Sequence, residues 1–280
     1  MMVFEQFLSF KSVRKRSYYA FGLSFAFVFV GYIVSRFFFG RTVSIAMLFL
    51  CTLLLVPSLV KLLAMEEKIE KKYGMKYFFK THQKVFKIYL FVFLGILAGY
   101  LVLGAVSDDF DNNFQYQLNY LVKEQGLTEA SVDNFVQQEL HLGMNDFLGI
   151  LGANLEVLAI CFVLSLFYGA GAIFLIVFNA SVFASFILLI FRYIGEALGS
   201  FSAVALLFFV HMIPEVGGFL LAAIAGGVLS YAFYKEKFMG VSFKNVARDS
   251  LILLLIAVGL VVLGAVLEVF VTKNLVYRLL

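Results

Sequence analysis

Seven apolar runs of about twenty residues each dominate this sequence and leave little choice of fold. A helix needs about 20 residues to cross a hydrocarbon core about 30 Å thick, and it satisfies its backbone hydrogen bonds internally. The runs are Tyr18–Phe39, Thr42–Ala64, Phe86–Ser107, Phe147–Tyr168, Gly171–Phe191, Pro214–Tyr234 and Leu251–Val271. The sequence therefore predicts an all-α polytopic membrane protein with about seven transmembrane helices.

An eighth apolar piece, Phe201–Met212, has only 12 residues and is too short to cross a bilayer. Pro214 follows it, and a proline disfavours helical geometry in the residue before it. Proline is also favoured in the first turn of a helix. We therefore expect residues 201–212 to form a re-entrant segment or half-helix that ends at a break before Pro214.

Composition agrees with a membrane location and excludes several classes of function. Apolar residues make up 62% of the chain and charged residues 14%, whereas soluble domains average about 45–50% and about 25%. The net charge of +4 follows the predicted loops, so nucleic-acid binding is not expected. Cys51 and Cys161 both lie in apolar runs, which argues against a disulfide or zinc framework. We expect no cofactor and no resident metal.

The distribution of Lys and Arg predicts the orientation, because these residues favour cytoplasmic loops. The N-terminal tail and the segment around residues 65–85 are basic, whereas residues 108–146 are acidic and hold only Lys123. We place the first two segments inside and the third outside. The stretch Lys235–Arg248 falls inside only if residues 201–212 do not cross, and the C-terminus then lies outside.

The chain divides into three parts on this basis. Residues 1–107 form an apolar anchoring part that includes the cytoplasmic basic loop 65–85, and residues 108–146 form an outer acidic loop. Within that loop, apolar residues recur at helical spacing from Val132 to Leu140 after a candidate N-cap at Thr128, which predicts a short amphipathic helix. Residues 147–280 form a glycine-rich helical bundle.

Polar and ionisable residues inside the apolar runs are the candidates for function, because they are costly in lipid and usually face a bundle interior. They gather in the third part of the chain. His211 and Glu215 are four residues apart, a spacing that places two side chains on one helical face. The candidates for a binding site or a pathway are Asn154, Glu156, Asn179, His211, Pro214 and Glu215.

The stretch from about residue 147 to 234 resembles the stage II sporulation protein M family. The most specific element is His211-Met-Ile-Pro214-Glu215, followed by Gly226-Gly227; Asn154, the Gly169-Ala-Gly171 turn and Phe178-Asn179 add to it. The chain departs from the family pattern at Ala153 and Ala180, where members often have a second asparagine and a glycine. The resemblance implies a role similar to that of a scaffold in a cell-envelope complex, and it supplies no reaction.

Three functions remain open from the sequence. The first is a scaffold or assembly component of an envelope membrane complex, with the bilayer, other membrane proteins or further copies of the chain as partners. The second is a permease, channel or lipid-translocating protein with a polar intramembrane site. The third is an intramembrane hydrolase, which is disfavoured because His82 and His141 are expected on opposite sides of the membrane.

Overall fold

The structure is a computed structural model that describes residues 17–73, 78–107, 109–125, 144–168, 171–198, 201–235 and 240–272. All regular elements in these residues are helical, which confirms the all-α class. They are α3 (Tyr18–Phe39), η1 (Gly40–Thr42), α4 (Val43–Tyr73), α5 (Phe78–Val106), α6 (Phe110–Asn113), α7 (Gln115–Gln125), α9 (Met144–Tyr168), α10 (Gly171–Leu198), α11 (Phe201–Lys235), α12 (Val241–Val266) and η3 (Leu267–Thr272).

The helices match the predicted membrane spans closely. Six helices, α3, α4, α5, α9, α11 and α12, contain a described span long and apolar enough to cross a membrane. The remaining predicted run, Gly171–Phe191, lies in α10, whose described apolar part, Ile173–Leu189, is slightly shorter than a full span. The basic segment after the second run continues α4 to Tyr73 as a helix. The amphipathic helix expected near residues 128–140 lies outside the described residues.

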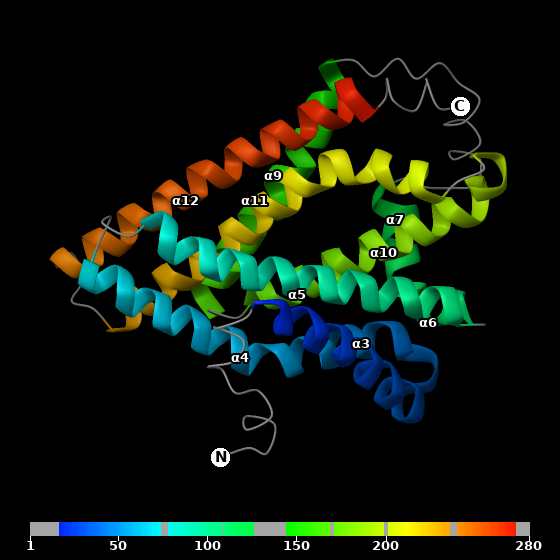
Figure 1. Cartoon of the computed structure of the whole chain (residues 1–280), viewed down its shortest axis with the longest axis horizontal. Helices are drawn as coiled ribbons and strands as arrows, with labels where there is room; N and C mark the ends of the chain where they lie inside the picture. The colour runs from blue at the N-terminus through cyan, green and yellow to red at the C-terminus, as the bar shows by residue number, and fades with distance from the viewer. Residues whose placement is uncertain are drawn as a thin grey trace.

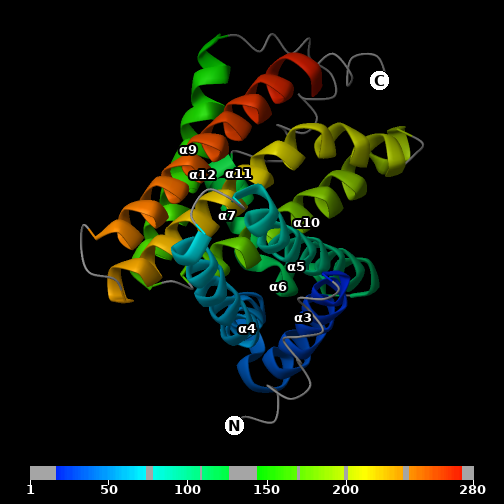
Figure 2. The same ribbon diagram turned by 60° about the vertical axis from the view of Figure 1, so that its left-hand side comes forward.

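The predicted break before Pro214 is wrong. Residues 201–212 are the first third of α11, a single 35-residue helix that contains Pro214 in its interior. Membrane helices tolerate an internal proline, because neighbouring groups and small local adjustments satisfy the backbone carbonyl that the proline leaves without a donor. The α11 ribbon changes direction along its course in both views (Figures 1 and 2), and a proline is an ordinary cause of such a bend.

The helix α11 is also longer than a membrane is thick. At 1.5 Å per residue its 35 residues span about 50 Å, compared with a hydrocarbon core of about 30 Å. The apolar piece that looked like a separate half-helix is therefore an extension of a crossing helix. Residues 201–212 therefore add no crossing of their own. The charge pattern required this if the stretch Lys235–Arg248 is to lie on the cytoplasmic side.

The second half of the chain is built around α11. In the most apolar window of α11, 88% of the residues are buried, whereas in that of α9 only 11% are. Both α9 and α12 pack along α11, and α10 joins this group to α4 and α5 of the first half (Figures 1 and 2). In the first half α3 packs against α5 and α4. The position of α11 makes its polar residues the ones most shielded from lipid.

Glycines set how closely the helices of the second half approach. A Cβ atom at Gly226 would overlap the Phe162 backbone oxygen of α9, and one at Gly218 would lie 2.8 Å from the Ala257 oxygen of α12. The Ser165 hydroxyl of α9 donates a 2.7 Å hydrogen bond to the backbone oxygen of Ala223. Small residues allow such close packing where lipid removes the hydrophobic drive between helices. The expected tight packing of the glycine-rich bundle is therefore present at these positions.

Part of the predicted outer loop packs into the bundle. Gln117 of α7 is fully buried; it accepts a 2.6 Å hydrogen bond from the Ser44 hydroxyl of α4 and donates a 3.1 Å bond to Ser181 of α10. At the surface, Arg36 of α3 forms a 3.1 Å ion pair with Asp109. These contacts tie α7 and the residues before it to three helices, so this part of the loop stabilises the fold.

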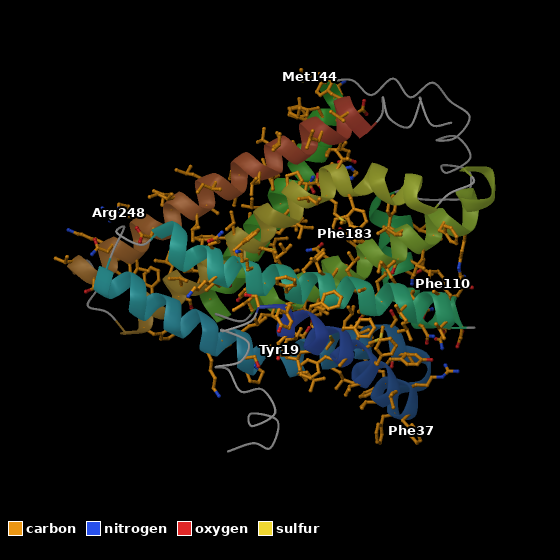
Figure 3. All side chains as sticks on the ribbon, viewed as in Figure 1. Tyr19, Phe37, Phe110, Met144, Phe183 and Arg248 are labelled. Atoms are coloured by element: carbon orange, nitrogen blue, oxygen red, sulfur yellow. The ribbon has the colours of Figure 1, made fainter. Side chains whose placement is uncertain are left out.

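Two segments that the charge pattern assigns to opposite sides lie at opposite ends of the molecule. Figure 3 shows Arg248, at the start of α12, at one end of the longest axis and Phe110, in the acidic loop, at the other. The end of α4 and the start of α5 lie toward the same end as the start of α12 (Figure 1). Which end faces the cytoplasm remains a prediction from the charge pattern.

Candidate functional site: an intramembrane His-Glu-Glu cluster

The continuous helix α11 carries His211 and Glu215 on one face. Residues four apart on an α-helix are neighbours on its surface, and Pro214 does not disturb this relation because the helix continues through it. Both side chains are buried, with 8% of His211 and 4% of Glu215 exposed. The two residues share a helical face because the break that was expected between them is absent.

A second carboxylate joins them from α12. Beyond Val266 that helix changes into the π-helical turn Leu267–Thr272, which carries the partly buried Glu268. One ligand atom from each of His211, Glu215 and Glu268 lies within 4.8 Å of the other two. π-Helical turns are rare and are often found at functional sites. We call these three residues the His-Glu-Glu cluster.

Two further residues hold Glu215 in place. The Asn154 side chain of α9 donates a 2.8 Å hydrogen bond from Nδ2 to Oε1 of Glu215. From a second helix, α12 approaches so closely at Gly264 that an added Cβ atom there would overlap Cγ of Glu215 and lie 3.1 Å from its Oε1. The carboxylate of Glu215 is therefore fixed by a hydrogen bond from one helix and by close packing against another.

The residues of the site lie at different depths in their apolar spans. Glu268 is three residues from Val271, where its span ends, whereas Asn154, the hydrogen-bond partner of Glu215, is ten residues from the start of the α9 span at Met144. At 1.5 Å per residue these positions are about 5 Å and about 15 Å from the ends of the spans. The charge pattern predicts that the end at which α9 begins and α12 ends is the outer one.

Lys and Arg are absent from the parts of α9, α11, α12 and η3 that surround the cluster. The sequence has no Lys or Arg in residues 144–168, 209–234 or 249–272. Two carboxylates side by side in a medium of low dielectric constant repel each other unless a positive charge lies between them. A proton, an imidazolium or a bound cation can supply that charge.

The structure separates two of the other predicted residues from the cluster. Glu156 is exposed on α9, although it is only two residues from Asn154. Asn179 is partly buried on α10, and its side chain forms no hydrogen bond with another described residue. Pro214 is buried in α11 beside Glu215. Of the six candidates, His211, Glu215 and Asn154 therefore meet at one place.

Sequence reasoning missed Glu268. It lies inside the predicted run Leu251–Val271, so the rule that selects ionisable residues within apolar runs applies to it as well. Glu268 lies only three residues from the end of that run. Only the packing of η3 against α11 shows that its side chain turns toward His211 and Glu215.

Comparison with known families decides the classification. Residues 88–273 match the family model of stage II sporulation protein M. The chain belongs to the stage II sporulation protein M family. The match extends well beyond residues 147–234, where the resemblance was seen, and it includes all three residues of the His-Glu-Glu cluster and Asn154. Neither the curated proteins nor the solved structures contain a match.

Proposed function

We propose that this integral membrane protein of the stage II sporulation protein M family is a transport protein. In this proposal its glycine-rich half binds a small charged solute and moves it across the bilayer. The observation that carries the proposal is the His-Glu-Glu cluster, three ionisable side chains from two helices that meet within the membrane. Ionisable residues in such positions commonly mark ion or substrate pathways.

Two features of the bundle support a transport role. The first is the bend in α11 (Figures 1 and 2), because helices with an internal proline are common near transport sites. The second is the position of Glu268 three residues from the end of its span at Val271, where a solute can enter from one side. The helices α11 and α12 meet at Gly218 and Gly264 with little side-chain volume between them, so a small relative movement changes the space around the cluster.

Flux measurements on reconstituted vesicles test this proposal. The full chain is reconstituted into vesicles, and the transport of protons, monovalent cations, divalent cations and a fluorescent lipid is followed for the parent and for the double variant His211→Ala, Glu215→Gln. We expect at least one flux above that of empty vesicles, and at least a 10-fold loss of that flux in the double variant. Asp111→Asn, an exposed carboxylate on α6, is the control and should keep the flux.

Gel filtration of each variant before reconstitution shows whether it is folded. Equal leak from empty vesicles, parent vesicles and double-variant vesicles would sink the transport proposal. Flux of lipid alone, unchanged in the double variant, would also count against it, because the pathway would then not involve the cluster.

A different observation favours a second candidate, the role of an assembly component. Few residues of α9 are buried, and Glu156 is exposed near the middle of its span. A charged side chain in that position is costly in lipid. Along the same helix, added Cβ atoms at Gly149 and Gly152 would meet no other atom, so a second helix can approach closely there. These features suit contact with another membrane protein or a second copy of the chain.

Photo-crosslinking in native membranes tests the assembly role. A photoreactive residue is placed at Leu148 or Val163, both exposed on α9, and at Ile33, an exposed control on α3. We expect a crosslinked product from the two α9 positions and none from Ile33. Recovery of uncrosslinked chain at full yield from all three positions would contradict the assembly role.

A further inference from the structure

We infer that the His-Glu-Glu cluster binds a divalent transition-metal cation. Its ligands are an imidazole nitrogen of His211 and one carboxylate oxygen each from Glu215 and Glu268. The inference rests on the proposed function, since it names the class of solute that the intramembrane site takes. From the sequence we expected no metal, because it contains no group of histidines or cysteines. That reasoning did not consider the carboxylates of Glu215 and Glu268 as ligands.

The arrangement of the three side chains suits a first-row metal. In protein sites Zn²⁺ has bonds of about 2.0–2.2 Å to nitrogen and oxygen, so its ligand atoms lie roughly 3.4 Å apart in a tetrahedral arrangement. The three ligand atoms of the cluster already lie within 4.8 Å of one another. Small side-chain rotations would bring the ligand atoms from this separation to the distances of a metal site. Three protein ligands leave a coordination position open for water or another group.

Charge balance favours a divalent ion over a monovalent one. Glu215 and Glu268 together carry two negative charges when ionised, and residues 144–168, 209–234 and 249–272 contain no Lys or Arg. A divalent cation between them makes the site neutral, which removes the cost of leaving net charge in a medium of low dielectric constant. The imidazole completes the ligand set without adding charge when it is neutral.

The ligand types distinguish among divalent ions. Ca²⁺ and Mg²⁺ prefer oxygen ligands only, whereas Mn²⁺, Fe²⁺, Co²⁺ and Zn²⁺ accept imidazole together with carboxylates. Soft ions such as Cu⁺ prefer sulfur, and Cys51 and Cys161 are not among the residues of the cluster. The site therefore fits a first-row transition metal, with Mn²⁺ and Zn²⁺ as suitable probes.

Asn154 is a positioning residue in this scheme. A carboxylate has two oxygens, so Glu215 can accept the hydrogen bond of Asn154 through Oε1 and bind the ion through the other oxygen. Such hydrogen bonds to a metal ligand orient it, and their loss typically lowers metal affinity about 10–100-fold. Asn154→Leu should therefore weaken metal binding without removing any ligand.

Equilibrium dialysis of the purified full chain tests the inference. The protein is treated with chelator in detergent and dialysed against Zn²⁺ or Mn²⁺, and bound metal is measured by mass spectrometry. We expect one ion per chain, at least 10-fold weaker binding in Glu268→Gln, and weak competition from Mg²⁺ or Ca²⁺. Asp111→Asn, which removes an exposed carboxylate outside the cluster, should bind as the parent does.

Glu268→Gln is the principal variant, because Glu268 is less buried than Glu215 and its exchange disturbs the core least. Gel filtration and thermal unfolding of the metal-free proteins show whether each variant is folded. His211→Ala serves as a second ligand variant if Glu268→Gln does not purify as a folded protein. No binding by the folded parent would overturn the inference, and so would equal binding by the parent and either ligand variant.

The outcome for the metal and the outcome for transport are separable, because dialysis needs no gradient and no vesicle. Metal binding without any flux supports the inferred metal site and contradicts the transport proposal. Flux of protons that depends on the cluster, without metal binding, removes the inference and leaves the transport proposal in place.

Discussion

Replacing Gly226 by valine should prevent α9 and α11 from packing together. A Cβ atom at this position overlaps the backbone oxygen of Phe162 and lies 2.9 Å from Cβ of Ser165. A backbone oxygen in a helix cannot move aside as the end of a flexible side chain can, so the two helices must separate. Overpacking typically costs about 1–3 kcal/mol, and we expect at least the upper end of this range here. Thermal unfolding in detergent measures the loss.

Gly259→Val in α12 is the matched control, because an added Cβ atom at Gly259 meets no other atom within 4 Å. It introduces the same β-branched residue into a membrane helix, so it measures the effect of the changed helix propensity without the overlap. The expected result is a large fall in the unfolding temperature for Gly226→Val and a small change for Gly259→Val. Equal changes in the two variants would show that the close approach of α9 to α11 does not determine stability.

Much of the fold could be predicted from hydropathy alone. A helix is the simplest structure that satisfies its backbone in lipid, so the seven apolar runs indicate seven helices, and α3 begins and ends at the predicted residues. The error at residues 201–212 arose from applying a rule for soluble helices to Pro214. In the membrane, breaking a helix exposes several backbone groups, whereas keeping it continuous through a proline leaves one carbonyl to be satisfied.

The candidate site was only partly predictable. Helical spacing was sufficient to place His211 and Glu215 together once α11 was continuous. Asn154 and Glu156 are only two residues apart on α9, and hydropathy cannot determine which of them faces the core, because both sides of that helix are apolar. The contribution of Glu268 depends on packing between α11 and η3, for which a single sequence gives no signal.

The glycines show the same limit. A glycine-rich composition allows close helix packing in the second half, but Gly149 and Gly152 of α9 have open space beside them. In the first half an added Cβ atom at Gly95 of α5 would overlap Phe21 and Ser24 of α3. Composition therefore indicates where close helix contacts are possible, and only the three-dimensional arrangement shows where they occur.

The close contact at Gly264 links the packing of the bundle to the geometry of the cluster. Glu215 is held between the Asn154 hydrogen bond and the α12 backbone at Gly264. A displacement of the Glu215 side chain at Gly264 therefore also displaces Oε1, the atom that accepts the hydrogen bond of Asn154. A substitution at Gly264 should change both stability and the binding of a cation, although glycine itself contributes no ligand.

Gly264→Ala should destabilise the protein by about 1–3 kcal/mol, and most of that loss should disappear in a chain that also carries Glu215→Ala. The overlap of the added methyl group is with Cγ of Glu215, an atom that alanine lacks. Contacting residues commonly show coupling energies of about 0.5–3 kcal/mol in a double-mutant cycle. Unfolding in detergent is measured for the parent, both single variants and the double variant.

Gly259→Ala, placed in the parent and in Glu215→Ala, is the control for this cycle, because Gly259 lies in open space on the same helix. It should show no coupling to Glu215. Additive effects of Gly264→Ala and Glu215→Ala would contradict the contact between α12 and Glu215. Since that contact holds the carboxylate against Asn154, Gly264→Ala alone should also weaken Zn²⁺ binding, whereas Gly259→Ala should leave it unchanged.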